Sequence, residues 1–190
     1  MSIDSSDIKK GLKIQLDGVP FTVVEFQFVK PGKGTAFTRT RVKNLMTGAV
    51  IDRTFRSGER LTPADIEQNE MQFLYKEGDM FVFMDTQTYE QIQLVPDLIG
   101  DNQYYLTDGT MCEVLFFSGK PIGVTAPTFV VQKVVSTEPG FKGDTSSNTT
   151  KAARLEGGLE VQVPLFIDEG ESLKIDTRTG EYVERVNLKK

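Results

Sequence analysis

Residues 21–56 read FTVVEFQFVKPGKGTAFTRTRVKNLMTGAVIDRTFR, and this stretch decides the fold class. β-Branched and aromatic residues dominate two runs, residues 21–29 and 36–45, which flank a short segment with proline and glycine at 30–34. A third run, residues 50–55, follows the turn-forming pair Thr47-Gly48. Such runs separated by turn residues predict β-strands joined by hairpins. Because helical periodicity is almost absent from the chain, the sequence predicts an all-β protein.

A further strand is expected before this stretch. Residues 12–16 alternate between apolar and polar side chains, and Asp17-Gly18 is a hairpin signal. Four or five short strands in about 60 residues predict a small closed barrel, because closure removes exposed sheet edges.

Two boundaries divide the chain into three expected domains, residues 1–64, 65–127 and 128–190. The acidic stretch 57–70 carries few large apolar residues, and Pro127 marks the second boundary. The last two domains have the length and strand number of OB-type barrels. The expected strands there are residues 71–75, 80–84, 89–94, 111–117, 129–135, 159–163, 173–175 and 182–186, with one helical turn at 96–100.

Charge is distributed unevenly along the chain. The formal net charge is -5. Residues 1–63 hold 11 basic and 6 acidic side chains, residues 64–127 hold 2 and 11, and residues 128–190 hold 9 and 10. A basic first third before an acidic middle favours a protein whose one end meets phosphate. The alternative is uneven charge on an ordinary surface.

Several function classes are disfavoured by what the sequence lacks. There is no histidine, and no GxxxxGK[ST] or CxxC motif occurs, so nucleophilic, nucleotide-hydrolysing and zinc chemistry lose their usual residues. The single cysteine, Cys112, sits in the apolar run MCEVLFF and is expected to be a buried thiol. Neither a signal peptide nor a membrane span is recognisable, which predicts a cytoplasmic protein. The missing histidine and motifs predict a non-enzymatic protein without a cofactor or metal.

The loop 30–34 is the first candidate functional segment. Pro31 and Gly32 suit the second and third positions of a type II turn, the third requiring a positive φ, so Lys33 is presented just beyond a tight bend. Gly34 adds freedom on the other side of Lys33, and two glycines permit close approach to a crowded partner. The alternative interpretation is a solvated hairpin with an incidental lysine.

The strand after the loop carries a row of cations. Arg39, Arg41 and Lys43 alternate with other residues and therefore project from one face, about 7 Å apart. Arg53 and Arg56 on the next strand are expected to extend the row. Such a row suits a phosphate backbone because it supplies charge without converging geometry. The alternative is a strand face that meets only solvent.

At this point the sequence resembles the bacterial elongation factor P family. The motif VKPGKG followed by a basic strand resembles the family's first domain. The segments 99–102, 140–145 and 176–186 resemble further segments of the same family. Residues at the spacing of the family's C-terminal signature are Lys151, Ala153, Gly158, Val161, Val163, Pro164, Ile167 and Gly170. The resemblance covers essentially the whole chain. The archaeal and eukaryotic counterpart has two domains, and the length here favours the bacterial form.

The resemblance implies a fold and a mechanism. The fold would be a KOW-type (SH3-like) barrel followed by two OB barrels, arranged like a tRNA. The factor would enter a 70S ribosome stalled at consecutive prolines, beside the peptidyl-tRNA, and ribosomal RNA would do the chemistry. Lys33, within the loop Lys30, Pro31, Gly32, Lys33 and Gly34, would reach toward the CCA end and be lengthened by a modifying enzyme.

The resemblance also implies further contacts. Arg39, Arg41 and Lys43 would lie along the tRNA, and Tyr182 and Arg185 would meet tRNA from the last domain, their alternative being a strand-end stack and a surface ion pair. Gly143, Asp144 and Thr145 lie in a polar loop and match the family's loop near the E-site mRNA codon. Three alternatives stay open: a paralogue of the family, a general OB-type protein that binds single-stranded RNA, and a small enzyme.

Overall fold

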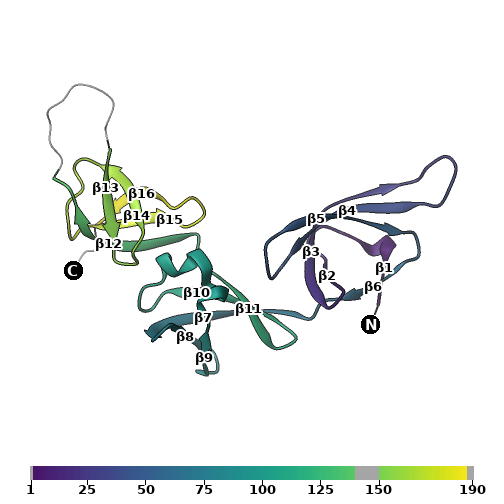
Figure 1. Ribbon diagram of the computed structural model, residues 1–190, viewed down its shortest axis with the longest axis horizontal. Helices are drawn as coiled ribbons and strands as arrows, with labels where there is room; N and C mark the ends of the chain where they lie inside the picture. The colour runs from purple at the N-terminus through teal and green to yellow at the C-terminus, as the bar shows by residue number, and fades with distance from the viewer. Residues whose placement is uncertain (1, 140–149, 188–190) are drawn as a thin grey trace. The chain divides into compact units, whose positions relative to one another are not determined.

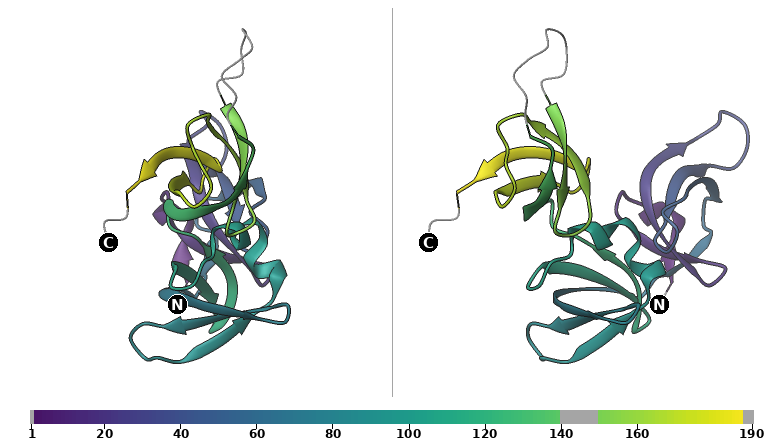
Figure 2. Two further views of the ribbon diagram at one scale, coloured as in Figure 1. Left: turned by 90° about the vertical axis from the view of Figure 1, so that its left-hand side faces the viewer. Right: turned by 60° about the vertical axis from the view of Figure 1, so that its left-hand side comes forward.

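The computed structural model describes residues 2–139 and 150–187, and most of these residues lie in β-strands (Figure 1). The prediction of an all-β protein is therefore confirmed. The chain divides into two compact units, Met1–Gln68 with Leu115–Gly123 and Asn69–Val114 with Val124–Lys190. Within the described residues the strands form three sheets, and each sheet is curled into part of a barrel (Figure 2).

The first sheet is antiparallel, with strand order β1-β6-β2-β3-β4-β5. Its strands are β1 (Ile3–Asp4), β6 (Arg60–Pro63), β2 (Lys13–Leu16), β3 (Val19–Val29), β4 (Phe37–Asn44) and β5 (Val50–Arg56), and the 3-10 turn η1 (Ser5–Asp7) follows β1. The apolar side chains that face inward form one cluster. Its buried members are Ile8, Ile14, Phe21, Val23, Val42, Phe55 and Leu61.

The hairpin between β2 and β3 confirms the predicted turn. Asp17 and Gly18 have φ values of 50° and 80°. Positive φ at both central residues is the requirement of a type I′ turn, whose twist matches that of the flanking strands. The register Leu16↔Val19 follows directly, and it fixes which side chains of β3 face the core.

The hairpin formed by β3 and β4 is the longest feature of this sheet. The two strands pair from Phe21↔Asn44 to Val29↔Phe37, with one β-bulge between Val23 and Glu25. Figure 1 shows these strands as an indigo hairpin that extends past the neighbouring strands to its loop. The loop 30–36 is thus held at the end of a paired, two-stranded arm.

The second sheet has the order β11-β10-β7-β8-β9. Its core contains Phe73, whose ring centroid lies 6.0 Å from that of Phe81 and 5.4 Å from that of Phe83. A short helical segment follows β9 and leads into β10. The elements are β7 (Ile66–Glu77), β8 (Met80–Asp85), β9 (Gln91–Leu94), α1 (Pro96–Ile99), η2 (Gly100–Tyr105), β10 (Met111–Phe117) and β11 (Lys120–Thr125).

The third sheet has the order β14-β13-β12-β15-β16. Strand β12 is central, and every second residue from Val130 to Val134 is buried. Its strands are β12 (Phe129–Thr137), β13 (Thr150–Leu155), β14 (Glu160–Pro164), β15 (Ser172–Asp176) and β16 (Glu181–Val186).

The structure differs from the prediction in several segments. The acidic stretch 57–70, which was expected only to separate the first domain from the second, contains β6 and the start of β7, and its one buried apolar side chain, Leu61, joins the first core. Strands β1, β11 and β13 were not predicted. In β13 the buried Lys151 donates a hydrogen bond from Nζ to the carbonyl oxygen of Glu138 at 2.8 Å, so a lysine occupies a place where an apolar residue would signal a strand. The division at residues 64 and 127 stays a prediction.

Candidate functional site

The loop that carries Lys33 is fully accessible. All side chains from Lys30 to Thr35 are exposed. Gly34 has a φ of +113°, whereas Gly32 does not have a positive φ. The predicted type II turn with a left-handed Gly32 is therefore wrong. The bend that needs a glycine follows Lys33 instead of preceding it, so we expect Gly34 to be the position that resists substitution.

The row of cations on β4 is formed as predicted. Burial alternates along the strand, with Thr38, Thr40 and Val42 buried, while the cations are exposed on the opposite face. The exposed cations are Arg39, Arg41 and Lys43. This face of the β4 strand therefore presents three positive charges in line.

Two of these cations have neighbours within their own face. The Arg41 guanidinium lies 3.5 Å from a carboxylate oxygen of Glu25 and 3.8 Å from one of Asp52. All three side chains are more than half exposed, and both distances exceed those of a strong ion pair, so the pairing is weak. Arg39 lies over the ring of Phe37 at 5.4 Å.

The register decides which cations of β5 share this face. Arg56 is opposite Phe37, two residues from Arg39, and therefore extends the row as predicted. Arg53 is opposite Thr40, whose side chain points to the other face. The expectation that Arg53 extends the row is wrong, because the pairing between strands, which spacing along the chain does not reveal, sets its face.

The other face of the same arm carries aromatic side chains that the sequence did not single out. Phe26 and Phe28 are 48% and 49% exposed and are opposite the buried Thr40 and Thr38. The ammonium of Lys30 lies 5.7 Å from the ring centroid of Phe28. The two-residue spacing of Phe26 and Phe28 already places both rings on one face of the strand. The sequence does not show that this face is exposed beyond the core, because that depends on where the neighbouring strands end.

The predicted site residues of the third sheet are engaged with their own domain. Tyr182 is partly buried against the core of that sheet. Arg185 donates to a carboxylate oxygen of Glu171 at 2.8 Å, and its guanidinium lies 5.6 Å from the ring centroid of Phe166. The pKa of Glu171 is lowered, first by a hydrogen bond from the backbone N–H of Asp168 and then by Arg185. Gly143, Asp144 and Thr145 lie outside the described residues.

Family models match three successive segments of the chain. Residues 4–61 match the model of the "Elongation factor P (EF-P) KOW-like domain", residues 66–124 that of the "Elongation factor P (EF-P) OB domain", and residues 130–185 that of "Elongation factor P, C-terminal". The chain is 53% identical over 183 residues to an elongation factor P from Moorella thermoacetica, covering 96% of this chain and 99% of that protein. It is also 52% identical over 184 residues to one from Desulforapulum autotrophicum, covering 97% and 98%.

The chain belongs to the elongation factor P family. It is therefore a translation elongation factor that associates with the ribosome. The KOW-like and OB domains expected from the sequence are confirmed by the family models and by the curled sheets.

A solved structure supports the same assignment. The archaeal protein described as "Eukaryotic translation initiation factor 5A from Methanococcus jannaschii" is 26% identical, with a TM-score of 0.54, over 66% of this chain and 92% of that chain. The elongation factor P chain thus shares the fold of a shorter translation factor over about two thirds of its length.

The described residues give little support for a metal site or a reactive thiol in this elongation factor. In residues 2–139 and 150–187, no three His, Cys, Asp or Glu side chains are grouped so that they could hold a metal ion. The Cys112 thiol is buried as predicted, and burial raises its pKa to about 12, so it is not a reactive thiolate at neutral pH. None of the helices in the described part of the chain is long and apolar enough to cross a membrane.

Proposed function

We propose that this elongation factor binds the ribosome beside the peptidyl-tRNA, with its Lys33 loop directed toward the CCA end, and promotes peptide-bond formation at consecutive prolines. The observation that carries the proposal is the exposed Lys33 at the end of a paired arm, followed at once by the outward-facing Arg39, Arg41 and Lys43. A cation at the tip would meet the CCA end while the row behind it neutralises acceptor-arm phosphates.

The proposed effect is positioning, without proton transfer by the factor. Holding the CCA end and the nascent chain in an attack-ready geometry lowers the entropic part of the barrier, and ribosomal RNA supplies the reacting groups. The absence of histidine from the sequence supports a non-enzymatic factor. Such a factor would act in the cytoplasm, where a modifying enzyme would lengthen the accessible Lys33 amine.

Further contacts belong to the same proposal. Tyr182 and Arg185 would meet tRNA, for which Arg185 would have to exchange Glu171 for a phosphate, and the loop with Gly143, Asp144 and Thr145 would approach the E-site codon. Lys30, Pro31, Gly32 and Gly34 would shape the loop around Lys33.

The test is the variant Lys33→Ala with Lys10→Ala as its matched control, since Lys10 is also an exposed lysine of the first unit. We expect Lys33→Ala to melt like the wild type and to lose most of its rescue of a polyproline reporter, whereas Lys10→Ala keeps rescue. Equal rescue by Lys33→Ala would remove Lys33 from the mechanism. Intact-mass spectrometry with peptide mapping across Lys33 tests the modification separately.

A further inference from the structure

A buried amide joins the second and third sheets within one unit of the chain. Gln132 on the central strand β12 is 1% exposed. Its Nε2 donates to the backbone carbonyl oxygen of Tyr104, in η2, at 2.8 Å. Its Oε1 accepts from the backbone N–H of Gly157 at 3.3 Å. One side chain thus binds both the segment that follows the second sheet's β9 and a turn of the third sheet.

Gly157 is required by close approach rather than by backbone conformation. A Cβ at this position would lie 2.1 Å from the carbonyl oxygen of Tyr104 and within 2.9 Å of both amide atoms of Gln132. Its φ is not in the left-handed region. Because backbone atoms cannot swing aside like a flexible side chain, any other residue at 157 would separate the two elements.

The segment bound by Gln132 is anchored on both sides of Tyr104. The ring of Tyr105 is buried in the core of the third sheet, and burial raises its pKa, with the carboxylates of Asp101 and Asp176 adding to the effect. Asn102 donates to the carbonyl oxygen of Val124 at 2.9 Å and accepts from the N–H of Ala126 at 3.1 Å. The connection between the sheets is therefore tied to η2 as well.

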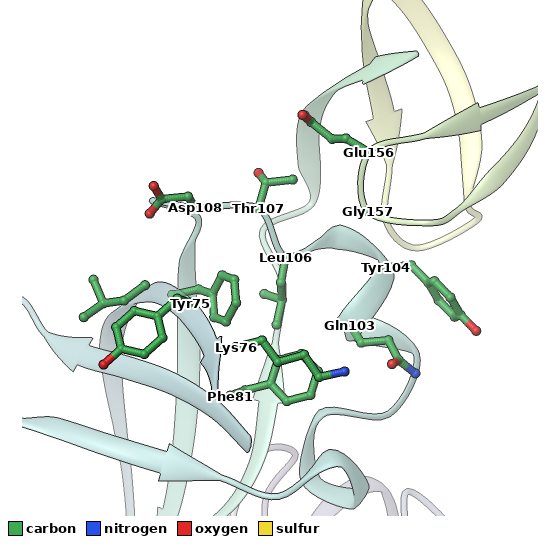
Figure 3. A pocket seen from close by; sticks show the side chains of 12 residues that line it. Tyr75, Lys76, Phe81, Gln103, Tyr104, Leu106, Thr107, Asp108, Glu156 and Gly157 are labelled. Carbon is green, nitrogen blue, oxygen red and sulfur yellow. The ribbon is translucent and has the colours of Figure 1, made fainter. Parts of the chain in front are cut away.

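The contact of Gln132 with Tyr104 and Gly157 is here called the joint. Figure 3 shows its surroundings, where the turn with Glu156 and Gly157 lies beside the segment with Tyr104 and Leu106. Both segments line the same hollow, to which Tyr75 and Phe81 of the second sheet also contribute. The hollow lies beside the hydrogen bonds of Gln132, which add polar contacts to the packing of Tyr105 in the core of the third sheet.

We propose that Gln132 is a positioning residue that, with Gly157, locks the second and third sheets into one rigid body. The factor would then present its C-terminal barrel to the ribosome in a fixed orientation to the middle barrel, without paying the entropy of orienting it on binding. The proposal goes beyond the Lys33 mechanism and does not depend on it. Removing the Gln132 amide would leave a buried carbonyl and a buried N–H without this partner, shifting the closed-to-open equilibrium of the joint by about 5- to 150-fold.

Two variants at the joint and two control variants test whether these contacts hold the two sheets rigidly together. Gln132→Met keeps the volume but removes both polar atoms, and Gly157→Ala adds the excluded Cβ. Gln162→Met changes an exposed glutamine of β14 in the same way, and Gly123→Ala adds a Cβ where nothing lies within 4 Å. Spin labels on cysteines at the exposed positions Asp79 and Glu160 report the distance between the sheets, since the buried Cys112 does not react.

We expect a narrow distance distribution in the wild type and both controls, and a broadened one in Gln132→Met and Gly157→Ala. An unchanged width in the joint variants would overturn the proposal. Should neither joint variant fold, 15N relaxation of the wild type decides, because different rotational correlation times for the two sheets would equally refute a rigid body. Lys33→Ala should keep the narrow distribution, so a failure of the lock is distinguishable from a failure of the proposed function.

Discussion

The cationic face of β4 makes a quantitative prediction for the variant Arg39→Ala with Arg41→Ala. If each guanidinium neutralises one phosphate, its loss lowers the slope of log affinity against log salt by somewhat under one unit. Raising the salt from about 50 to about 200 mM then weakens binding about threefold for each contact. Two contacts predict that the wild type loses about tenfold more affinity over this range than the double variant.

The structure indicates whether Arg41, like Arg39, is available to neutralise a phosphate. Arg41 must leave Glu25 and Asp52 to reach a phosphate, but its distances of 3.5 and 3.8 Å at exposed side chains indicate that this exchange costs little. Arg53→Ala is the control for each single β4 substitution, because it removes one positive charge from the opposite face of the sheet.

The assay is ribosome or tRNA binding measured at several salt concentrations. Parallel slopes for the wild type and the double variant would refute the phosphate assignment and leave the row to solvent. A slope change for Arg53→Ala as large as that for one β4 arginine would show that net charge, and not the face, governs binding.

Two further predictions concern titration. The pKa of Cys112 is raised to about 12 by burial, so we expect negligible alkylation of the folded protein at neutral pH and rapid alkylation in denaturant, measured by mass spectrometry; rapid native labelling would contradict the burial. The pKa of Asp176 is lowered to about 2 by hydrogen bonds and charge from Arg178, so the carboxylate stabilises the fold above its ordinary pKa near 3.8 and loses that contribution as pH falls through about 2. Denaturation of Asp176→Asn should therefore differ from the wild type above about pH 4 and converge with it near pH 2, and a constant difference would contradict the pairing.

The alternation of side chains between the two faces of a strand correctly predicted part of the site. Arg39, Arg41 and Lys43 share a face because their strand is regular, and strand geometry alone requires it. The hairpin at Asp17-Gly18 followed in the same way, since few residue pairs tolerate a positive φ twice.

Features that depend on pairing between distant segments could not be predicted from spacing. Arg53 was placed on the wrong face because its register with Thr40 was unknown. Gly34, and not Gly32, takes the left-handed conformation, and the motif alone does not show which of the two glycines will do so. Gln132 looked like any strand glutamine, and only the fold brings Tyr104 and Gly157 to its amide.

The regular pairing of β3 and β4 from Glu25↔Arg41 to Val29↔Phe37 also means that the distance by which Lys33 extends from the sheet can change only in steps. Each residue pair contributes about 3.4 Å of length, and successive pairs point to opposite faces. Removing one pair would retract the tip by that amount but exchange the aromatic face for the cationic one beyond the deletion. Removing two pairs would retract it by about 7 Å and restore both faces. Shortening or lengthening that keeps the cations outward must therefore come in even numbers of pairs, and intermediate reach is left to the loop 30–36 or to chemical extension of the lysine itself.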